Sequence, residues 1–165
     1  MGTIAPRRQR SKKEEQEFGL ARKEFIICPD CSCVFFEKAW HHSLEEDAKH
    51  LKEFKGLKFK VCPADRMKKN KIFEGEVIIE LSKEKLGEKK EVLNAVKNSD
   101  EQARAHDPMD RILWIEEKGG EIRIFTSENQ LAVRIGKKLK SSFKGGTLKI
   151  KHSHEEDVMR VYWDY

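Results

Sequence analysis

The spacing of apolar residues changes near residue 72. Before that point the apolar residues form short runs that predict strands, at 25–27, 34–36 and 58–61. Ser43 and Glu46 form a capping-box pattern that predicts a short helix to about Glu53. The first residues lack hydrophobic periodicity and predict a disordered basic arm. The pattern therefore divides the chain into three parts: an arm over 1–23, a small module over 24–71 and a larger domain over 72–165.

The larger domain alternates between strand and helix patterns. Alternating or short apolar runs predict strands at 73–81, 111–116, 121–125, 148–150 and 158–163. Apolar residues three to four apart predict a helix over about 88–105 and a second helix that begins at Ser127, its expected N-cap, and ends before Gly145. This β-α-β-β-α-β order with a terminal strand predicts an α+β fold class. We expect a ferredoxin-like, mainly antiparallel sheet with two helices on one face.

The cysteines of the small module have the spacing of a metal site. Cys28 and Cys31 form a Cys-x-x-Cys turn, which places two thiolates on one side of a zinc ion. Further along, Cys62 begins a second knuckle, and Asp65 stands where a second cysteine is expected. Because a carboxylate oxygen is an accepted zinc ligand, the sequence predicts a zinc-binding zinc ribbon with these four ligands.

The fourth ligand has alternatives in the sequence. The competing residues are Cys33, His41, His42 and His50. A closed site of four protein ligands leaves no position for water and predicts a structural role, whereas an open site would permit catalysis. A third possibility is a decayed site that binds no metal. The chain has no glycine-rich phosphate loop and no nucleophile–base motif, so we expect a protein that is not an enzyme.

The charge of the chain is uneven. The net charge is +5, and the basic residues concentrate near the start of the chain and around the second knuckle. Basic clusters bind polyanions through counterion release, although many lysine runs are only solvated surface. The predicted RNA-contacting residues are Arg7, Arg8, Arg10, Lys58, Lys60, Arg66, Lys68, Lys69 and Lys71.

The hydropathy pattern bears on location. Mean hydropathy is −0.75, and the chain contains no apolar run of the roughly 18 residues that would span a membrane. The N-terminal charges are followed by no apolar core of a secretory signal. Three of the four cysteines lie within six positions, which suits reduced metal ligands better than a disulfide framework. We therefore expect a cytoplasmic protein.

Several motifs together resemble a known family. They are Cys-Pro-Asp-Cys at 28–31, Cys-Pro-Ala-Asp at 62–65, Phe-Glu-Gly-Glu-Val at 73–77, the run at 128–136 and Met-Arg-Val at 159–161. They resemble a family of small uncharacterised bacterial zinc-knuckle proteins. That family is distantly similar to the N-terminal zinc-binding part of the nonsense-mediated-decay-3 family, the adaptor for large ribosomal subunit export.

The resemblance covers most of residues 25–165 and implies association with RNA or a ribosomal particle. The family pattern would have paired Cys-x-x-Cys knuckles, so Asp65 departs from it, as does Cys33 where a small residue is expected. We therefore expect a zinc-binding, RNA-binding or ribosome-associated protein. The alternative is a zinc-stapled adaptor that binds another protein through a sheet edge and binds no nucleic acid.

Overall fold

The structure is a computed structural model that describes residues 17–19, 24–36, 38–42 and 56–165. The chain divides into two compact units, Met1–Lys60 and Val61–Tyr165. Most of the predicted arm, including Arg7, Arg8 and Arg10, and the predicted helix from Ser43 lie outside the described residues. The division assigns the second knuckle and the helix that follows it to the larger unit.

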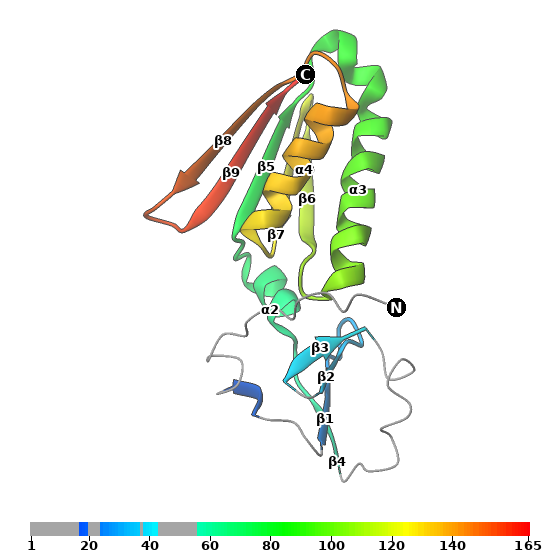
Figure 1. Cartoon of the computed structure of the whole chain (residues 1–165), viewed down its shortest axis with the longest axis vertical. Coiled ribbons are helices and arrows are strands. Elements are labelled where there is room, and N and C mark those ends of the chain that lie inside the picture. Colours follow the sequence, from blue (N-terminus) through cyan, green and yellow to red (C-terminus); the bar gives the residue numbers. More distant parts are fainter. Residues whose placement is uncertain (1–16, 20–23, 37, 43–55) are drawn as a thin grey trace, which may run out of the picture. The chain divides into compact units, whose positions relative to one another are not determined.

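The first unit contains a small sheet of four short strands with the order β3-β2-β1-β4 (Figure 1). Its strands are β1 (Glu24–Ile27), β2 (Val34–Phe36), β3 (Ala39–His41) and β4 (Gly56–Phe59). β1, β2 and β3 form an antiparallel meander, whereas β4 pairs with β1 in parallel. β1 and β2 agree with the predicted strands, β4 shares only Lys58 and Phe59 with the strand predicted at 58–61, and β3 was not predicted.

Each face of the small sheet holds a few apolar side chains. Phe35 and Trp40 lie directly opposite each other on β2 and β3, and Phe18 packs against both rings. The other face carries a cluster of Phe25, Val34 and Phe36. The apolar clusters formed by the described residues of this sheet are small, and small cores are commonly supplemented by a further constraint such as a metal.

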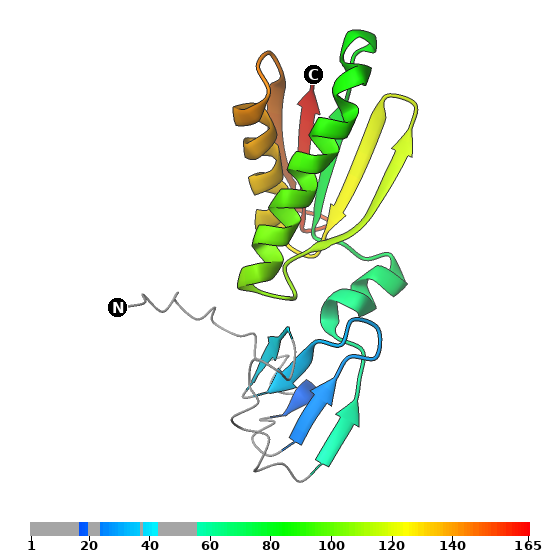
Figure 2. The same ribbon diagram turned by 90° about the vertical axis from the view of Figure 1, so that its right-hand side faces the viewer.

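The second unit contains a larger sheet with the order β6-β7-β5-β9-β8 (Figure 2). Its elements, in chain order, are α2 (Pro63–Asn70), β5 (Gly75–Glu80), the 3-10 helix η2 (Lys83–Glu88), α3 (Lys89–His106), β6 (Ile112–Lys118), β7 (Glu121–Thr126), α4 (Asn129–Ser142), β8 (Thr147–Ser153) and β9 (Val158–Asp164). Both long helices lie on one face of this sheet (Figures 1 and 2).

The core of the second unit lies between this sheet face and α3 and α4. It contains 14 buried residues from the strands and helices. Leu131, Ile135 and Leu139 repeat every four residues on α4 and are fully buried, as their spacing predicts. Gly136 on the same helix lies so close to β9 that a Cβ atom would come within 2.4 Å of a Val161 methyl group. A side chain here would separate α4 from the sheet.

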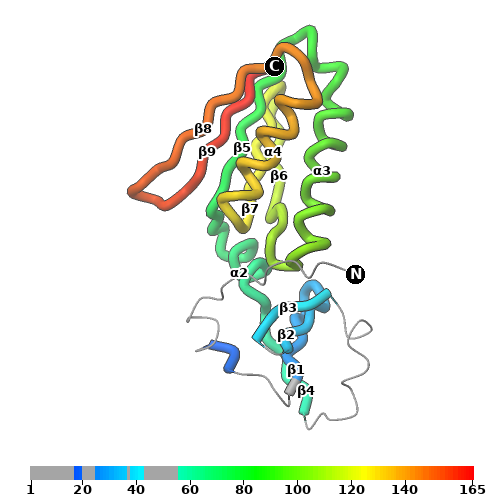
Figure 3. Tube along the Cα trace, viewed as in Figure 1, coloured from blue at the N-terminus to red at the C-terminus, as the bar shows by residue number. Residues whose placement is uncertain are grey.

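The predicted mixed α+β class and the order of the elements after residue 72 agree with the structure, but the sheet differs from a simple ferredoxin-like arrangement. β9 lies between β5 and β8 (Figure 3), and it pairs with β5 in parallel and with β8 antiparallel. The chain therefore returns by a β8–β9 hairpin, which places its last strand inside the sheet. Among the described residues, no helix combines the length and the apolar character needed to cross a lipid bilayer.

Candidate metal centre

The first two candidate ligands lie in the turn that connects β1 to β2. The Cys28 amide donates to the Cys33 carbonyl at 2.9 Å, and the Ser32 amide donates to the Cys28 carbonyl at the same distance. Ser32 has a φ of 62°, a left-handed conformation that lets the chain turn sharply. These bonds close a tight loop in which Cys28 is fully buried and Cys31 is half-buried.

Parallel pairing of β1 with β4 explains why distant cysteines meet. Ile27 lies opposite Phe59, and the Lys60 amide donates to the Ile27 carbonyl at 3.1 Å. Both strands therefore end at the same edge of the small sheet. Cys28 is the next residue after β1, and Cys62 follows Lys60 by two positions. The register therefore brings Cys28 and the segment that leads to Cys62 to the same edge.

The second pair of candidate ligands lies at the start of α2. Cys62 is the N-cap, Pro63 occupies the first turn, and Asp65 is the third helical residue. The Asp65 amide donates to Cys62 Sγ at 3.4 Å, and the Cys62 thiol donates to Asp65 Oδ2 at 3.2 Å. Proline and an acidic residue both favour a helix N-terminus. Asp65 therefore also stabilises α2, a second reason for an aspartate at this position.

One atom from each of Cys28, Cys31, Cys62 and Asp65 forms a cluster whose members all lie within 4.8 Å of one another. Zinc–sulfur bonds of about 2.3 Å in a tetrahedron separate ligand atoms by roughly 3.7 Å, so a small contraction would close this cluster around an ion. The donor set of three thiols and one carboxyl oxygen fits a divalent, thiophilic metal. The structure thus brings together the same four residues that the spacing predicts.

The alternative ligands differ in their surroundings. The Cys33 backbone carbonyl accepts the hydrogen bond from Cys28, and its side chain is buried outside the cluster of four. His41 Nε2 lies 3.2 Å from the Phe36 carbonyl oxygen, across the β2–β3 turn. His42 also lies outside the cluster, and His50 lies outside the described residues.

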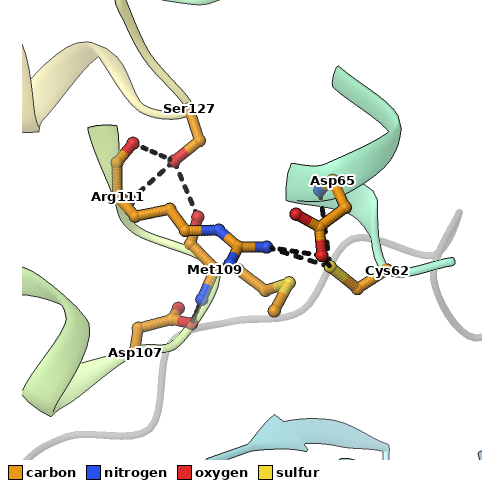
Figure 4. A network of polar contacts seen from close by, with 6 residues as sticks. All are labelled: Cys62, Asp65, Asp107, Met109, Arg111 and Ser127. Carbon is orange, nitrogen blue, oxygen red and sulfur yellow. Dashed lines mark hydrogen bonds and ion pairs between the residues drawn. The ribbon is translucent and has the colours of Figure 1, made fainter. Parts of the chain in front are cut away.

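Arg111 contacts both candidate ligands of α2 (Figure 4). Its Nη2 lies 3.1 Å from Cys62 Sγ and 3.2 Å from Asp65 Oδ2, and the residue is only 6% exposed. A divalent ion bound by three thiolates and one carboxylate leaves a net charge of about −2, which is costly in a buried site. The guanidinium reduces that charge and orients the carboxylate, as outer hydrogen-bond partners do in metal sites.

The backbone of Arg111 is held by Ser127. The Ser127 hydroxyl accepts from the Arg111 amide at 2.9 Å and donates to the Met109 carbonyl at 2.6 Å (Figure 4). The Ser127 amide also donates to the Arg111 carbonyl at 3.0 Å. Ser127 was predicted to cap α4, but the N-cap is Glu128 and makes no side-chain capping bond. The prediction was wrong because the buried Ser127 hydroxyl bonds the loop before β6 instead.

The segments before and after Arg111 contain further charged groups. The Asp107 carboxylate accepts from the Met109 amide at 2.8 Å, which shapes the loop that leads to Arg111. Asp110 accepts an ion-pairing bond from Arg134, yet burial raises the pKa of Asp110 above its ordinary value. Burial likewise raises the pKa of Asp100, whose carboxylate accepts from the Ile112 amide at 2.6 Å.

The predicted RNA-contacting residues that the structure describes lie on two elements. Lys58 is in β4, and Lys60 follows it, with its Nζ 3.4 Å from a Glu17 carboxylate oxygen and 4.6 Å from the centre of the Phe18 ring. Of the α2 residues, Lys68 and Lys69 are exposed and Arg66 is half-buried. Lys71 ends the helix in a left-handed conformation, and its Nζ lies 4.4 Å from the Trp114 ring centre.

Comparison with models of known protein families and with curated protein sequences gives no match. The resemblance drawn from the motifs therefore stays a prediction.

Sequence reasoning missed α2 and Arg111. Pro63 directly after Cys62, with Asp65 two positions later, is a helix-start pattern that would have predicted α2. Arg111 carries no local pattern, because its partners lie more than 45 positions away in the chain. Only the packing of α2 against the loop before β6 brings them together.

Proposed function

We propose that this protein binds one zinc ion through Cys28, Cys31, Cys62 and Asp65, and that the ion stabilises the fold. The cluster of four donor atoms within 4.8 Å is the observation that carries this proposal. Two of its thiols, those of Cys28 and Cys62, are fully buried, where a metal thiolate is shielded from solvent and oxidants. Zinc fits best because it favours four-coordinate sites rich in sulfur.

A structural role suits this site better than a catalytic one. Four protein donors complete a tetrahedron and leave no position for a water molecule or substrate. A catalytic zinc site keeps an open position beside a general base. The Arg111 guanidinium, which contacts Cys62 and Asp65, is a cation that cannot act as a base at neutral pH.

The proposed partner is RNA, free or in a ribosomal particle. Support comes from the basic residues that flank the second ligand pair: Lys68 and Lys69 are exposed on α2, and Lys71 ends the same helix. Acidic residues are few on this helix, with Asp65 engaged by Arg111. Such a surface binds phosphates without sequence preference, and the resulting affinity falls steeply with salt.

Zinc binding and RNA binding are tested on the same sample of untagged, full-length protein purified at low salt. We expect one zinc per chain by elemental analysis and an absorbance ratio that indicates bound RNA. A preparation that folds without any metal would contradict the zinc proposal. Zinc-bound protein that shows no affinity for RNA at low salt would contradict the RNA proposal alone.

The α2 surface is tested by neutralising Lys68, Lys69 and Lys71 together to Gln. We expect a clear loss of RNA affinity and a salt slope that is smaller by about one for each lost phosphate contact. A matched control changes Lys137, Lys138 and Lys140 of α4 to Gln, because these lysines are also exposed and carry the same charge. Equal affinities of the two variants would rule out a specific contribution from α2.

A protein-binding adaptor is the second candidate function. β4 is an edge strand of the small sheet, and two of its apolar residues, Leu57 and Phe59, are 53% and 67% exposed. An exposed edge with apolar side chains can accept a strand from another protein. A salt-tolerant stoichiometric protein complex that is lost in Phe59→Ser would support this alternative.

A further inference from the structure

In the second unit, α3 and α4 cover one face of the five-stranded sheet, and the opposite face is called the open face here (Figures 1 and 2). α3 and α4 pack on the face that carries Val77, Ile124 and Val161 (Figure 2). Because side chains alternate along a strand, the neighbours of these residues point to the other face. The register places Glu76 between Phe125 of β7 and Arg160 of β9 on that open face. The next row in the register contains Ile78, Arg123 and Tyr162.

Charge divides the open face into two halves. The half at the start of β5 contains Arg123 and Arg160, with Lys149 and Lys151 aligned on β8 and one acidic residue, Glu116 of β6, opposite Arg123. The opposite half contains an acidic row: Glu80 is aligned with Glu121 on one side and with Asp164 on the other. A polyanion is therefore attracted to one half of the face and repelled by the other.

A buried carboxylate holds the two arginines in place. Glu76 is only 1% exposed, although it lies on the open face. One carboxylate oxygen accepts from Arg123 Nη2, and the other accepts from Arg160 Nε at 3.1 Å. Arg160 also donates from Nη2 to Glu156, so two carboxylates balance the two arginines, and the net positive charge of this half comes from its lysines. These bonds hold both guanidinium groups in place. The two arginines therefore lose less side-chain entropy on binding an anion than free arginines would.

Aromatic rings lie among these cations. Trp114 of β6 stacks on Phe125, with ring centres 4.6 Å apart and an angle of 19° between the ring planes. The Nζ atom of Lys71 lies 4.4 Å from the Trp114 ring centre, and that of Lys151 lies 5.7 Å from the Tyr162 ring centre. Lys71 also ends α2, so the basic surface of α2 continues onto the aromatic half of the open face within one unit of the chain.

We propose that the basic and aromatic half of this open sheet face binds single-stranded RNA. The inference rests on the proposed RNA-binding function and assigns it a surface. Bases stack on Trp114 and Tyr162, while Arg123, Lys149 and Lys151 contact phosphates. Interleaved aromatic and basic side chains on a sheet are the chemistry that holds unpaired bases. The bound RNA runs across the sheet from β6 to β8, a distance of about 19 Å at the usual spacing between β-strands.

Paired RNA fits this face poorly. Stacking requires the flat surface of a base, which a duplex hides between neighbouring base pairs. The acidic row at the far half also limits the width of the bound polyanion. We therefore expect a single-stranded oligomer to bind more tightly than a hairpin of the same composition.

Trp114 provides a direct optical test. Trp40 and Trp163 are buried, whereas Trp114 is half-buried on the open face. We expect a short oligouridine to quench tryptophan fluorescence in the full-length protein. Trp114→Phe retains a ring that stacks on Phe125 but offers a smaller face to a base, so this variant should fold, show no quenching and bind oligouridine more weakly. Unchanged fluorescence in wild-type protein at saturating oligouridine would overturn the assignment.

The phosphate contacts are tested by Lys149→Gln combined with Lys151→Gln. Both lysines are exposed on edge strand β8, so the substitutions should leave the fold intact. We expect oligouridine affinity to fall about fivefold or more at low salt, with a salt slope smaller by about two. The matched control, Lys137→Gln with Lys140→Gln, changes the same charge on α4, on the covered side of the sheet. It should change the affinity less than twofold.

Tyr162→Leu tests stacking separately from charge, because leucine keeps the apolar bulk and removes the aromatic face. Loss of one base–aromatic stack lowers affinity by about fivefold or more. If wild-type protein binds RNA and the sheet-face variants bind as well as their controls, this inference is wrong and the proposed function stands. If wild-type protein binds no oligouridine at low salt, the proposed RNA-binding function fails together with it.

Discussion

The two sheets of this protein differ in the size of the apolar core that the described residues form. The five-stranded sheet packs on two helices around 14 buried residues. In the small sheet, the apolar clusters among the described residues are limited to a few side chains, such as Phe25, Val34 and Phe36. A buried core of the first kind sustains a domain, whereas a core of the second kind requires a covalent or metal constraint.

The position of the cysteines fits this difference. Cys28 and Cys31 lie in the turn that leaves β1, and Cys62 follows the strand that pairs with β1 in parallel. Parallel neighbours cannot be joined by a tight turn, so the chain between β1 and β4 must be long and ordering it is entropically costly. The proposed metal, which would join the ends of both strands, would offset this cost. The larger sheet has no such requirement, because its core already buries enough apolar surface.

Removal of the metal should have the largest effect, and it should destabilise the small sheet while leaving the five-stranded sheet folded. We expect a chelator, or Cys31→Ser, to abolish the structure of the small sheet, because its apolar core is insufficient. Amide signals from β1–β3 should collapse in a two-dimensional NMR spectrum, while those from β5–β9 should persist. Cys33→Ala serves as the control, since Cys33 lies outside the four-residue cluster. Simultaneous loss of both sets of signals would contradict the comparison.

A cavity in the core of the second unit should destabilise the five-stranded sheet and leave the metal site intact. Ile135 is fully buried between α4 and the sheet, so Ile135→Ala should lower the free energy of unfolding by about 2–5 kcal/mol. Denaturant unfolding followed by Trp163 fluorescence measures the change. Ile150→Ala is the control, because Ile150 is 41% exposed and should cost far less. Metal content at native conditions should remain one zinc per chain.

A substitution of Arg111 tests its contacts with the candidate ligands Cys62 and Asp65. Replacing Arg111 with Gln removes the cation beside Cys62 and Asp65. The negative charge of the bound ion together with its four ligands is then uncompensated. We expect zinc affinity to fall by about 10–100-fold in competition with a chromophoric chelator. Arg134→Gln is the matched control, because Arg134 pairs with Asp110 rather than with a candidate ligand. Equal zinc affinities in these two variants would refute the role of Arg111.

The smallest effect concerns pH and is confined to the second unit. Burial raises the pKa of Asp100, so its charged form destabilises the folded state at neutral pH. Asp100→Asn keeps an oxygen that accepts from the Ile112 amide, and it should raise the free energy of unfolding at pH 7 by less than about 1 kcal/mol.

The advantage of Asn at this position should shrink as pH falls through the folded-state pKa of Asp100, because the native carboxyl group then becomes neutral. It should disappear below the ordinary aspartate pKa of about 3.9. Unfolding curves over this pH range measure the difference between the two proteins. A constant difference across the range would contradict the assigned cause.

Local patterns predicted the elements whose formation depends on neighbouring residues. The four-residue repeat of Leu131, Ile135 and Leu139 marks α4, and alternation marks β5 and β7, because each pattern reflects one buried face. The four candidate ligands were also predictable, since Cys-x-x-Cys spacing reflects metal geometry directly. These features need no knowledge of distant contacts.

Other features depend on which distant segments pair. The insertion of β9 between β5 and β8 cannot be read from the β9 sequence, whose alternation suits either neighbour. The contact between Arg111 and Asp65 spans 46 positions and requires the packed unit. The Ser127 hydroxyl had a local capping role available, but the buried backbone before β6 offered it better partners.

The place of β9 in the sheet has a consequence for folding order. The parallel pairing aligns Gly75 with Met159, so the centre of the sheet joins segments that are synthesised far apart in time. Until residues 158–164 emerge from the ribosome, β5 has an open edge and β8 lacks its neighbour. Non-local pairing of this kind forms slowly and leaves aggregation-prone strand edges exposed in the nascent chain. The second unit therefore cannot complete its sheet until β9 pairs with both β5 and β8.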